Sequence, residues 1–132
     1  MTRQMKELQD ALPENSPTRL ISLTTDADYD TPEVLKTYAV RNGADAARWS
    51  FLTGTKKAVN HLAVDSLKLS AVEKKPEDRV SPDDLWVHST IFVLVDKHAQ
   101  LRGIYQTGGE DVSWPAEKRQ LLAAVKQLER EP

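Results

Sequence analysis

Three histidines are the side chains of this chain whose chemistry is best suited to binding a transition metal. His88 lies just before the apolar run 91–95, whereas His61 falls within an expected helix and His98 within an expected turn. Imidazole binds both oxidation states of copper, but Cu(I) prefers thiolates, and the 132 residues include no cysteine. One imidazole does not make a specific metal site, so the residues alone favour a structural role for His88 and solvated or locally hydrogen-bonded roles for His61 and His98.

Asp26, Asp28 and Asp30 form a second candidate site because their carboxylates are spaced two residues apart. Such a loop could hold a hard cation such as Ca²⁺, but no glycine or bidentate glutamate follows at the offsets of an EF-hand. The spacing instead predicts a turn followed by a helix. Asp30 or Thr31 would cap that helix and Pro32 would occupy its first position.

Nucleophilic catalysis is not expected, although Ser89 is adjacent to His88. Neighbouring residues of a strand point to opposite faces, so this serine and histidine cannot act together as nucleophile and base. The absence of cysteine also excludes disulfides and thiolate nucleophiles. We therefore do not expect an enzyme.

The composition excludes further classes of function. The net charge of −2 and the pI of about 5.9 provide no basic field for a nucleic acid backbone. The longest apolar run, 91–95, has the length of a strand, so these residues include no membrane anchor. Trp49, Trp86 and Trp114 are interpreted as core or rim residues, because no basic groove accompanies them.

Hydrophobic periodicity predicts an alternation of helices and strands. A charged segment at 70–86, with Pro76 and Pro82, is expected to be a mobile loop. Helices are predicted at 1–12, from Pro32 to just before Gly43, at 56–67, and from Pro115 to Leu128 with Ser113 as a cap. Strands are predicted at 18–25, 49–52, 91–95 and 101–105, the last two forming a hairpin with a five-residue connection.

Three motifs occur in order along the chain. They are Asp-x-x-x-Asp-Thr-Pro within residues 26–39, Trp-x-x-Leu-Thr-Gly within 48–54, and His-Ser-Thr followed by Val-Leu-Val-Asp within 88–96. Together they resemble the Sco/SenC family of thioredoxin-fold copper proteins, from about Met1 to the last helix. The resemblance implies an α/β, thioredoxin-like three-layer fold, with residues 1–132 as a single but incomplete domain.

The same resemblance implies a function and a site. His88 matches the copper-ligand histidine of the family, while Asp26 and Asp30 lie near the copper-loop edge and support the site or a partner surface. The implied metal is copper and the implied partner is the copper-containing subunit of cytochrome c oxidase. The implied location is periplasmic, or membrane-anchored and facing the periplasm. We expect copper delivery to be impaired in this cysteine-free chain. The alternative is a metal-free thioredoxin-like interaction module that has lost its redox or copper loop.

The resemblance further implies that the chain is truncated. In the family, a Cys-x-x-x-Cys-Pro loop follows the first core strand, and residues 1–5 look like the helix that begins after this loop. The absent strand would lie centrally, between the segments 18–25 and 91–95. Without it, these two strands pair directly, another chain fills the slot, or the native protein is longer and Met1 is an internal methionine. We expect the third arrangement.

Overall fold

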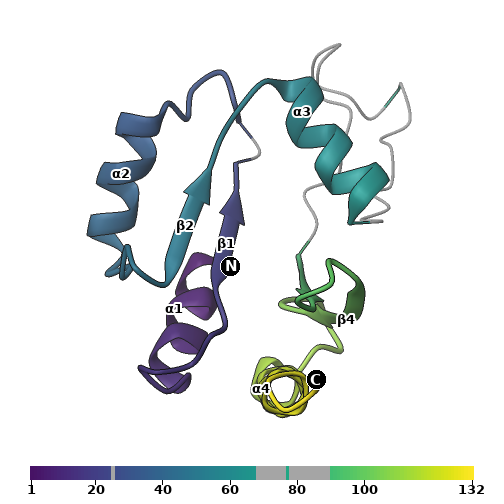
Figure 1. Cartoon of the computed structure of the whole chain (residues 1–132). Coiled ribbons are helices and arrows are strands. Elements are labelled where there is room, and N and C mark those ends of the chain that lie inside the picture. The colour runs from purple at the N-terminus through teal and green to yellow at the C-terminus, as the bar shows by residue number, and fades with distance from the viewer. Residues whose placement is uncertain (25, 68–76, 78–89) are drawn as a thin grey trace.

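The computed structural model describes residues 1–24, 26–67, 77 and 90–132, in which helices and strands alternate as predicted (Figure 1). The expected mobile loop 70–86 lies outside the described residues, apart from residue 77. The elements are α1 (Thr2–Ala11), β1 (Leu20–Leu23), α2 (Pro32–Arg41), β2 (Trp49–Leu52), α3 (Lys56–Asn60), the π-helix η1 (His61–Ser66), β3 (Ile91–Val95), β4 (Leu101–Gln106) and α4 (Trp114–Leu128).

The described strands form two separate two-stranded sheets. β1 pairs with β2 in parallel, and α2 makes the connection that a parallel pair requires. β3 and β4 form the predicted antiparallel hairpin, with residues 96–100 as the connection. No described strand joins β1 to β3. Direct pairing of these two strands, one of the three arrangements considered from the sequence, is therefore wrong.

Helix α1 is anchored to the chain around β2 by polar contacts. The N-cap residue of α1, Met1, makes no side-chain capping hydrogen bond. At its other end, the Arg48 guanidinium donates to the carbonyl oxygens of Leu12 and Pro13 at 3.1 and 3.2 Å, which satisfies acceptors that a helix end leaves free. The buried amide of Gln9 donates to the Gly43 carbonyl and accepts from the Asp45 N–H. These contacts position α1 against β2.

The segment between β1 and β2 follows the sequence closely. Thr31, one of the two candidates, is the N-cap of α2 and accepts a hydrogen bond from the Val34 N–H at 3.3 Å. Pro32 lies in the first turn, where its missing N–H is tolerated. Gly43 follows the helix with a φ of 70°, a conformation that glycine adopts without steric cost.

The predicted helix 56–67 begins as α-helix and continues as π-helix. Thr55 caps its start, but the Leu67 N–H bonds to the Leu62 carbonyl five residues earlier. This wider turn departs from the 3.6-residue period of an α-helix. Along this segment, Val59 and Ala63 are half-buried and Leu62 is exposed. The predicted helix is therefore present over nearly its whole length, and its second half is a π-helix.

One hydrophobic core cluster contains residues from both sheets and from the helices α1 and α4. Trp49 is its most buried side chain, stacks on Phe51 and donates from Nε1 to Ser22 Oγ at 3.0 Å. Leu121 and Val125 are buried, so the last helix packs on this core. The cluster consists of Leu8, Leu12, Leu20, Trp49, Phe92, Tyr105, Leu121 and Val125.

Helices α1 and α4 connect the two halves of the fold through Glu7. Its carboxylate accepts from Trp114 Nε1 at 2.9 Å and pairs with Lys118 Nζ at 3.4 Å. The hydrogen bond from Trp114, followed by the contact with Lys118, lowers the pKa of Glu7. Ser113 occupies the N-cap position of α4, but its side chain makes no capping hydrogen bond.

An ion-pair cluster joins the hairpin to the end of the chain. The Arg102 guanidinium donates to Asp96 Oδ2 at 2.9 Å and to both carboxylate oxygens of Glu131 at 2.8 and 2.9 Å. The Gln100 N–H and then the Arg102 guanidinium lower the pKa of Asp96, and Arg102 is also the main cause of the lowered pKa of Glu131. The cluster therefore favours both carboxylates in their charged forms.

We expect this cluster to make folding stability sensitive to acid. A carboxyl group whose pKa is lower in the folded than in the unfolded state stabilises the fold above its ordinary pKa, and that contribution is lost as the pH falls through the lowered value. Urea denaturation should thus show a loss of stability below about pH 5. Arg102→Gln should reduce this loss. An unchanged pH profile in Arg102→Gln would contradict the assignment.

Candidate functional site

The acidic loop that follows β1 is closed by its own hydrogen bonds. Thr24 Oγ1 donates to Asp30 Oδ2 and accepts from the Asp26 N–H at 2.9 Å. The Asp26 carbonyl accepts from the Asp30 N–H at 2.9 Å, and its Oδ1 accepts from the Tyr29 N–H at 3.3 Å. Asp26 and Asp30 therefore shape the loop, as the turn prediction required. The buried Thr24, which the sequence analysis did not single out, is the residue that links them.

Asp28 connects this loop to the start of α3. Its Oδ2 lies 2.8 Å from Lys56 Nζ, and both side chains are largely exposed. An exposed pair of this kind contributes little to stability, so its main effect is to bring the two loops together. The next residue of the loop, Tyr29, is 69% exposed and presents its aromatic ring to solvent. The loop thus offers a carboxylate and aromatic surface.

His88, the predicted copper ligand, lies outside the described residues, as do Ser89 and Trp86. The described chain resumes at Thr90, whose carbonyl accepts from the Thr107 N–H at 2.7 Å at the start of the hairpin. The structure thus describes β3, the strand that follows His88 in the sequence, and Phe92 of this strand is buried in the core. The described residues bring Asp26 and Asp30 together but do not place either against His88.

The other two histidines are exposed, as the sequence predicted. His61 Nδ1 lies 2.6 Å from Asp65 Oδ2 on the surface of η1. His98 lies in the hairpin connection, where its backbone N–H donates to Asp96 Oδ1 at 2.9 Å. Within the described part of the chain, no group of three or more histidine, cysteine or acidic side chains could hold a metal ion. These residues do not fit a copper site, because Cu(I) prefers thiolates and the chain has none.

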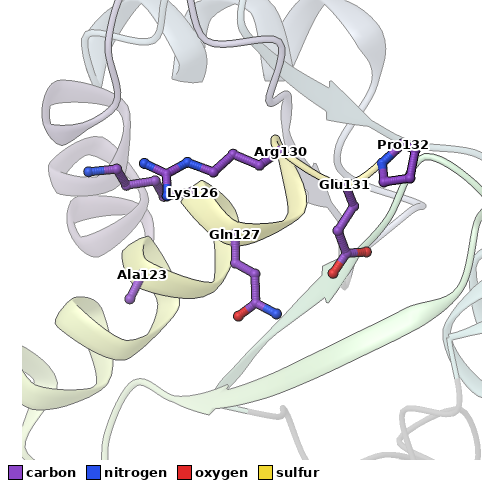
Figure 2. A pocket seen from close by; sticks show the side chains of 6 residues that line it. All are labelled: Ala123, Lys126, Gln127, Arg130, Glu131 and Pro132. Atoms are coloured by element: carbon purple, nitrogen blue, oxygen red, sulfur yellow. The ribbon is translucent and has the colours of Figure 1, made fainter.

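A shallow pocket at the end of α4 does not supply a reactive group either. Figure 2 shows Lys126 and Arg130 extending along one side of the helix end, while Gln127 points away from them. Glu131, the one carboxylate in the lining, is held by Arg102. The lining consists of Ala123, Lys126, Gln127, Arg130, Glu131 and Pro132. Among the helices that the structure describes, none is long and apolar enough to cross a membrane.

Comparison with known proteins gives a consistent result. The family model described as SCO1/SenC matches residues 1–123. The SCO1 protein homolog of Bacillus subtilis (strain 168) is 32% identical over 118 residues, which cover 85% of this chain and 58% of that protein. The chain therefore spans less than two thirds of the length of this relative.

Two solved structures resemble the fold. A SCO1/SenC family lipoprotein from Bacillus anthracis str. Ames gives a TM-score of 0.69 at 24% identity, over 96% of this chain and 70% of that one. The second structure is BsSco, described as a member of the Sco family of cytochrome c oxidase assembly proteins with a disulfide switch. It gives a TM-score of 0.68 at 28% identity, and the match covers 100% of this chain and 69% of the BsSco chain. The α/β architecture is therefore thioredoxin-like, as the sequence predicted, and its small sheets and helices fit a truncated domain of that fold.

Proposed function

This chain belongs to the SCO1/SenC family, and we propose on that basis that it takes part in copper delivery during the assembly of cytochrome c oxidase. The observation that carries the proposal is the family match over residues 1–123, a range that includes His88 and the acidic loop. The similarity to BsSco, a member of a family of cytochrome c oxidase assembly proteins, supports the proposed role in assembly of this oxidase.

Copper would be the cargo of this protein, and His88 the ligand that its own sequence supplies. A soft Cu(I) ion selects thiolates, so an imidazole alone holds it weakly. Because the 132 residues contain no cysteine, any thiolate ligands must come from outside them. We therefore propose that copper delivery by this chain alone is impaired, and that its role is non-catalytic.

Asp26 and Asp30 would act on the shape of the surface next to the copper-binding edge. Their hydrogen bonds to Thr24 and within the turn hold the loop, and Asp28 and Tyr29 remain exposed on it. The acceptor would be the copper-containing subunit of cytochrome c oxidase. The proposed location is periplasmic, or membrane-anchored and facing the periplasm, which fits this partner; the structurally similar protein from Bacillus anthracis is a lipoprotein.

A copper titration tests the proposal directly. The purified 132-residue chain should fail to compete with a chromophoric Cu(I) chelator, and His88→Ala and His98→Ala should behave like the parent chain. Tight Cu(I) binding that disappears in His88→Ala but persists in His98→Ala would contradict the impaired state, because it would show that His88 completes a site without thiolates.

The alternative function is a metal-free interaction module that keeps the family's fold and partner surface. It is favoured by the absence of cysteine and of a metal-binding group among the described residues. Reading the DNA upstream of the Met1 codon in frame separates the two. A Cys-x-x-x-Cys-Pro segment joined to Met1 would support copper delivery, whereas a stop codon close by would support the metal-free module.

A further inference from the structure

Asn42 is followed directly by Gly43 in the turn that ends α2. In such a pair, the backbone nitrogen of glycine can attack Cγ of the asparagine, because glycine has no side chain to hinder the approach. The other asparagines of the chain, Asn15 and Asn60, precede serine and histidine, whose side chains hinder this attack. Asn42 is half-buried and Gly43 is exposed, so water reaches the pair. The sequence therefore places a reactive asparagine in this turn.

The reaction open to this pair is a deamidation, with water as the co-reactant. The Gly43 nitrogen bonds to Cγ of Asn42 and gives up its proton, the Cγ–Nδ2 bond breaks, and the amide nitrogen leaves as ammonia. A succinimide ring remains, and water opens it at one of its two carbonyl carbons. Opening at Cγ gives aspartate. Opening at the main-chain carbonyl carbon gives isoaspartate, in which the main chain runs through Cβ and Cγ. Both products replace the neutral amide by a carboxylate.

The folded turn holds the pair away from the geometry of ring closure. In the ring, the Gly43 nitrogen must be rotated about the Asn42 Cα–C bond to the side of Cβ. At the observed ψ of 6°, it nearly eclipses the backbone nitrogen of Asn42 instead. The Gly43 N–H donates to the Val40 carbonyl at 3.1 Å. The Asn42 side-chain amide donates to the Tyr38 carbonyl at 2.8 Å. Both reacting groups are therefore engaged, and the reaction requires the turn to open.

Helix α1 holds this turn closed through Gln9. Its Nε2 donates to the Gly43 carbonyl at 3.1 Å, and its Oε1 accepts from the Asp45 N–H at 2.8 Å. Gln9 is 6% exposed, and hydrogen bonds are stronger where water is excluded. The Lys6 side chain also lies against Gly43, since a Cβ at this position would be 2.9 Å from Lys6 Cε. Rotation at Asn42 displaces the chain that follows, so ring closure competes with both Gln9 hydrogen bonds.

We propose that Asn42-Gly43 is a site of spontaneous deamidation and that the buried Gln9 amide of α1 controls its rate. Opening of the turn is a local equilibrium, and the rate follows the population of the open form. The modification also acts back on α1. Isoaspartate adds an atom to the main chain just before the Gly43 carbonyl and the Asp45 N–H, the two groups that Gln9 binds. The product therefore weakens the attachment of α1 to the segment before β2.

A peptide measurement on the full 132-residue chain tests the site. The chain is kept in mildly alkaline buffer, either folded or in concentrated urea, and is then cleaved after its lysines. The fragment 37–56 contains Asn42 and no other side-chain amide. Mass spectrometry detects the replacement of NH₂ by OH, and chromatography separates aspartate from isoaspartate. The fragment should be modified faster in urea than in the folded chain. Equal rates, or no reaction in urea, would overturn the proposal.

Two glutamine variants of α1 isolate the role of Gln9. Gln9→Ala removes both hydrogen bonds to the turn, which together correspond to at least roughly tenfold in the opening equilibrium. Folded Gln9→Ala should therefore deamidate at least about tenfold faster than the parent chain. Gln4→Ala is the matched control and should react like the parent, because Gln4 donates to the Thr107 carbonyl instead. In urea all three chains should react equally. A folded Gln9→Ala that reacts no faster than Gln4→Ala would overturn the proposal.

Hydrogen exchange of the parent chain keeps the proposal testable if Gln9→Ala fails to fold. Because the Gly43 N–H is bonded to the Val40 carbonyl, its exchange should be strongly slowed in the folded chain. A Gly43 amide that exchanges as fast as in urea would show that the turn is already open, and the control by α1 would be wrong.

The effect on α1 is measured on the modified chain itself. The isoaspartate form, separated by ion exchange, is compared with Asn42→Asp, which carries the same charge on an unchanged main chain. The isoaspartate form should unfold at a lower urea concentration than Asn42→Asp. Equal midpoints would show that the added main-chain atom does not disturb the Gln9 contacts, and the proposed weakening of α1 would be wrong.

Discussion

Replacing Trp49 by alanine is expected to lower the free energy of unfolding by about 3–5 kcal/mol, the cost of truncating a large aromatic residue in a core. Trp49 is 2% exposed, and its indole stacks on Phe51 at 4.8 Å and donates to Ser22 Oγ. Since single domains are stable by only about 5–15 kcal/mol, the variant should be partly unfolded at modest denaturant concentrations. Urea denaturation followed by circular dichroism measures the effect.

Two controls distinguish lost packing from the lost hydrogen bond. Trp49→Phe keeps an aromatic ring against Phe51 and should lose clearly less stability than Trp49→Ala. Ser22→Ala removes only the hydrogen-bond acceptor and should lower the free energy of unfolding by about 1 kcal/mol. The loss should reach up to about 3 kcal/mol if the buried indole N–H finds no other partner. If Trp49→Ala were as stable as Ser22→Ala, Trp49 would not be the centre of the core.

Joining a Cys-x-x-x-Cys-Pro segment to the start of the chain is expected to create tight Cu(I) binding that the 132-residue chain lacks. The two thiolates supply the ligands that Cu(I) prefers, and His88 adds the imidazole. In this extended protein, His88→Ala should weaken Cu(I) affinity by at least roughly 10–100-fold. Loss of a residue that only supports a metal ligand already lowers affinity by this amount, and His88 would be a ligand itself. Competition with a chromophoric Cu(I) chelator measures both changes.

The matched control for this experiment is His98→Ala in the same extended protein. His98 is exposed in the hairpin connection, so its removal should leave the Cu(I) affinity unchanged. A version with serine in place of both added cysteines should return to the weak binding of the parent chain. Equal Cu(I) affinity in His88→Ala and His98→Ala would show that His88 is not a copper ligand, and the proposed function would lose its site.

Local signals in the sequence predicted the elements well. Thr31 and Pro32 start α2 where capping chemistry placed them, and the connection 96–100 joins two strands of the predicted hairpin. These features depend on residues a few positions apart, so a short window contains the information. A helix was also predicted correctly at 56–67, but hydrophobic spacing did not show that its second half is a π-helix.

The candidate site was predictable only in part. The spacing of Asp26 and Asp30 indicated a turn, and the structure confirms one, but the role of Thr24 became visible only in its two hydrogen bonds. A threonine before an acidic turn is common, and nothing in its sequence context identifies the carboxylate that it will contact. His88 as a copper ligand stays a prediction from the family motif.

The sequence by itself determined the order of the elements, the absence of thiolate ligands and, through its motifs, the family. Only the tertiary structure decided that β1 and β3 belong to separate sheets, that Glu7 joins α1 to α4, and that Arg102 holds Glu131. The physical reason is the distance along the chain. Periodicity and capping are set by neighbouring residues, whereas these contacts join residues far apart and form only when the whole core packs.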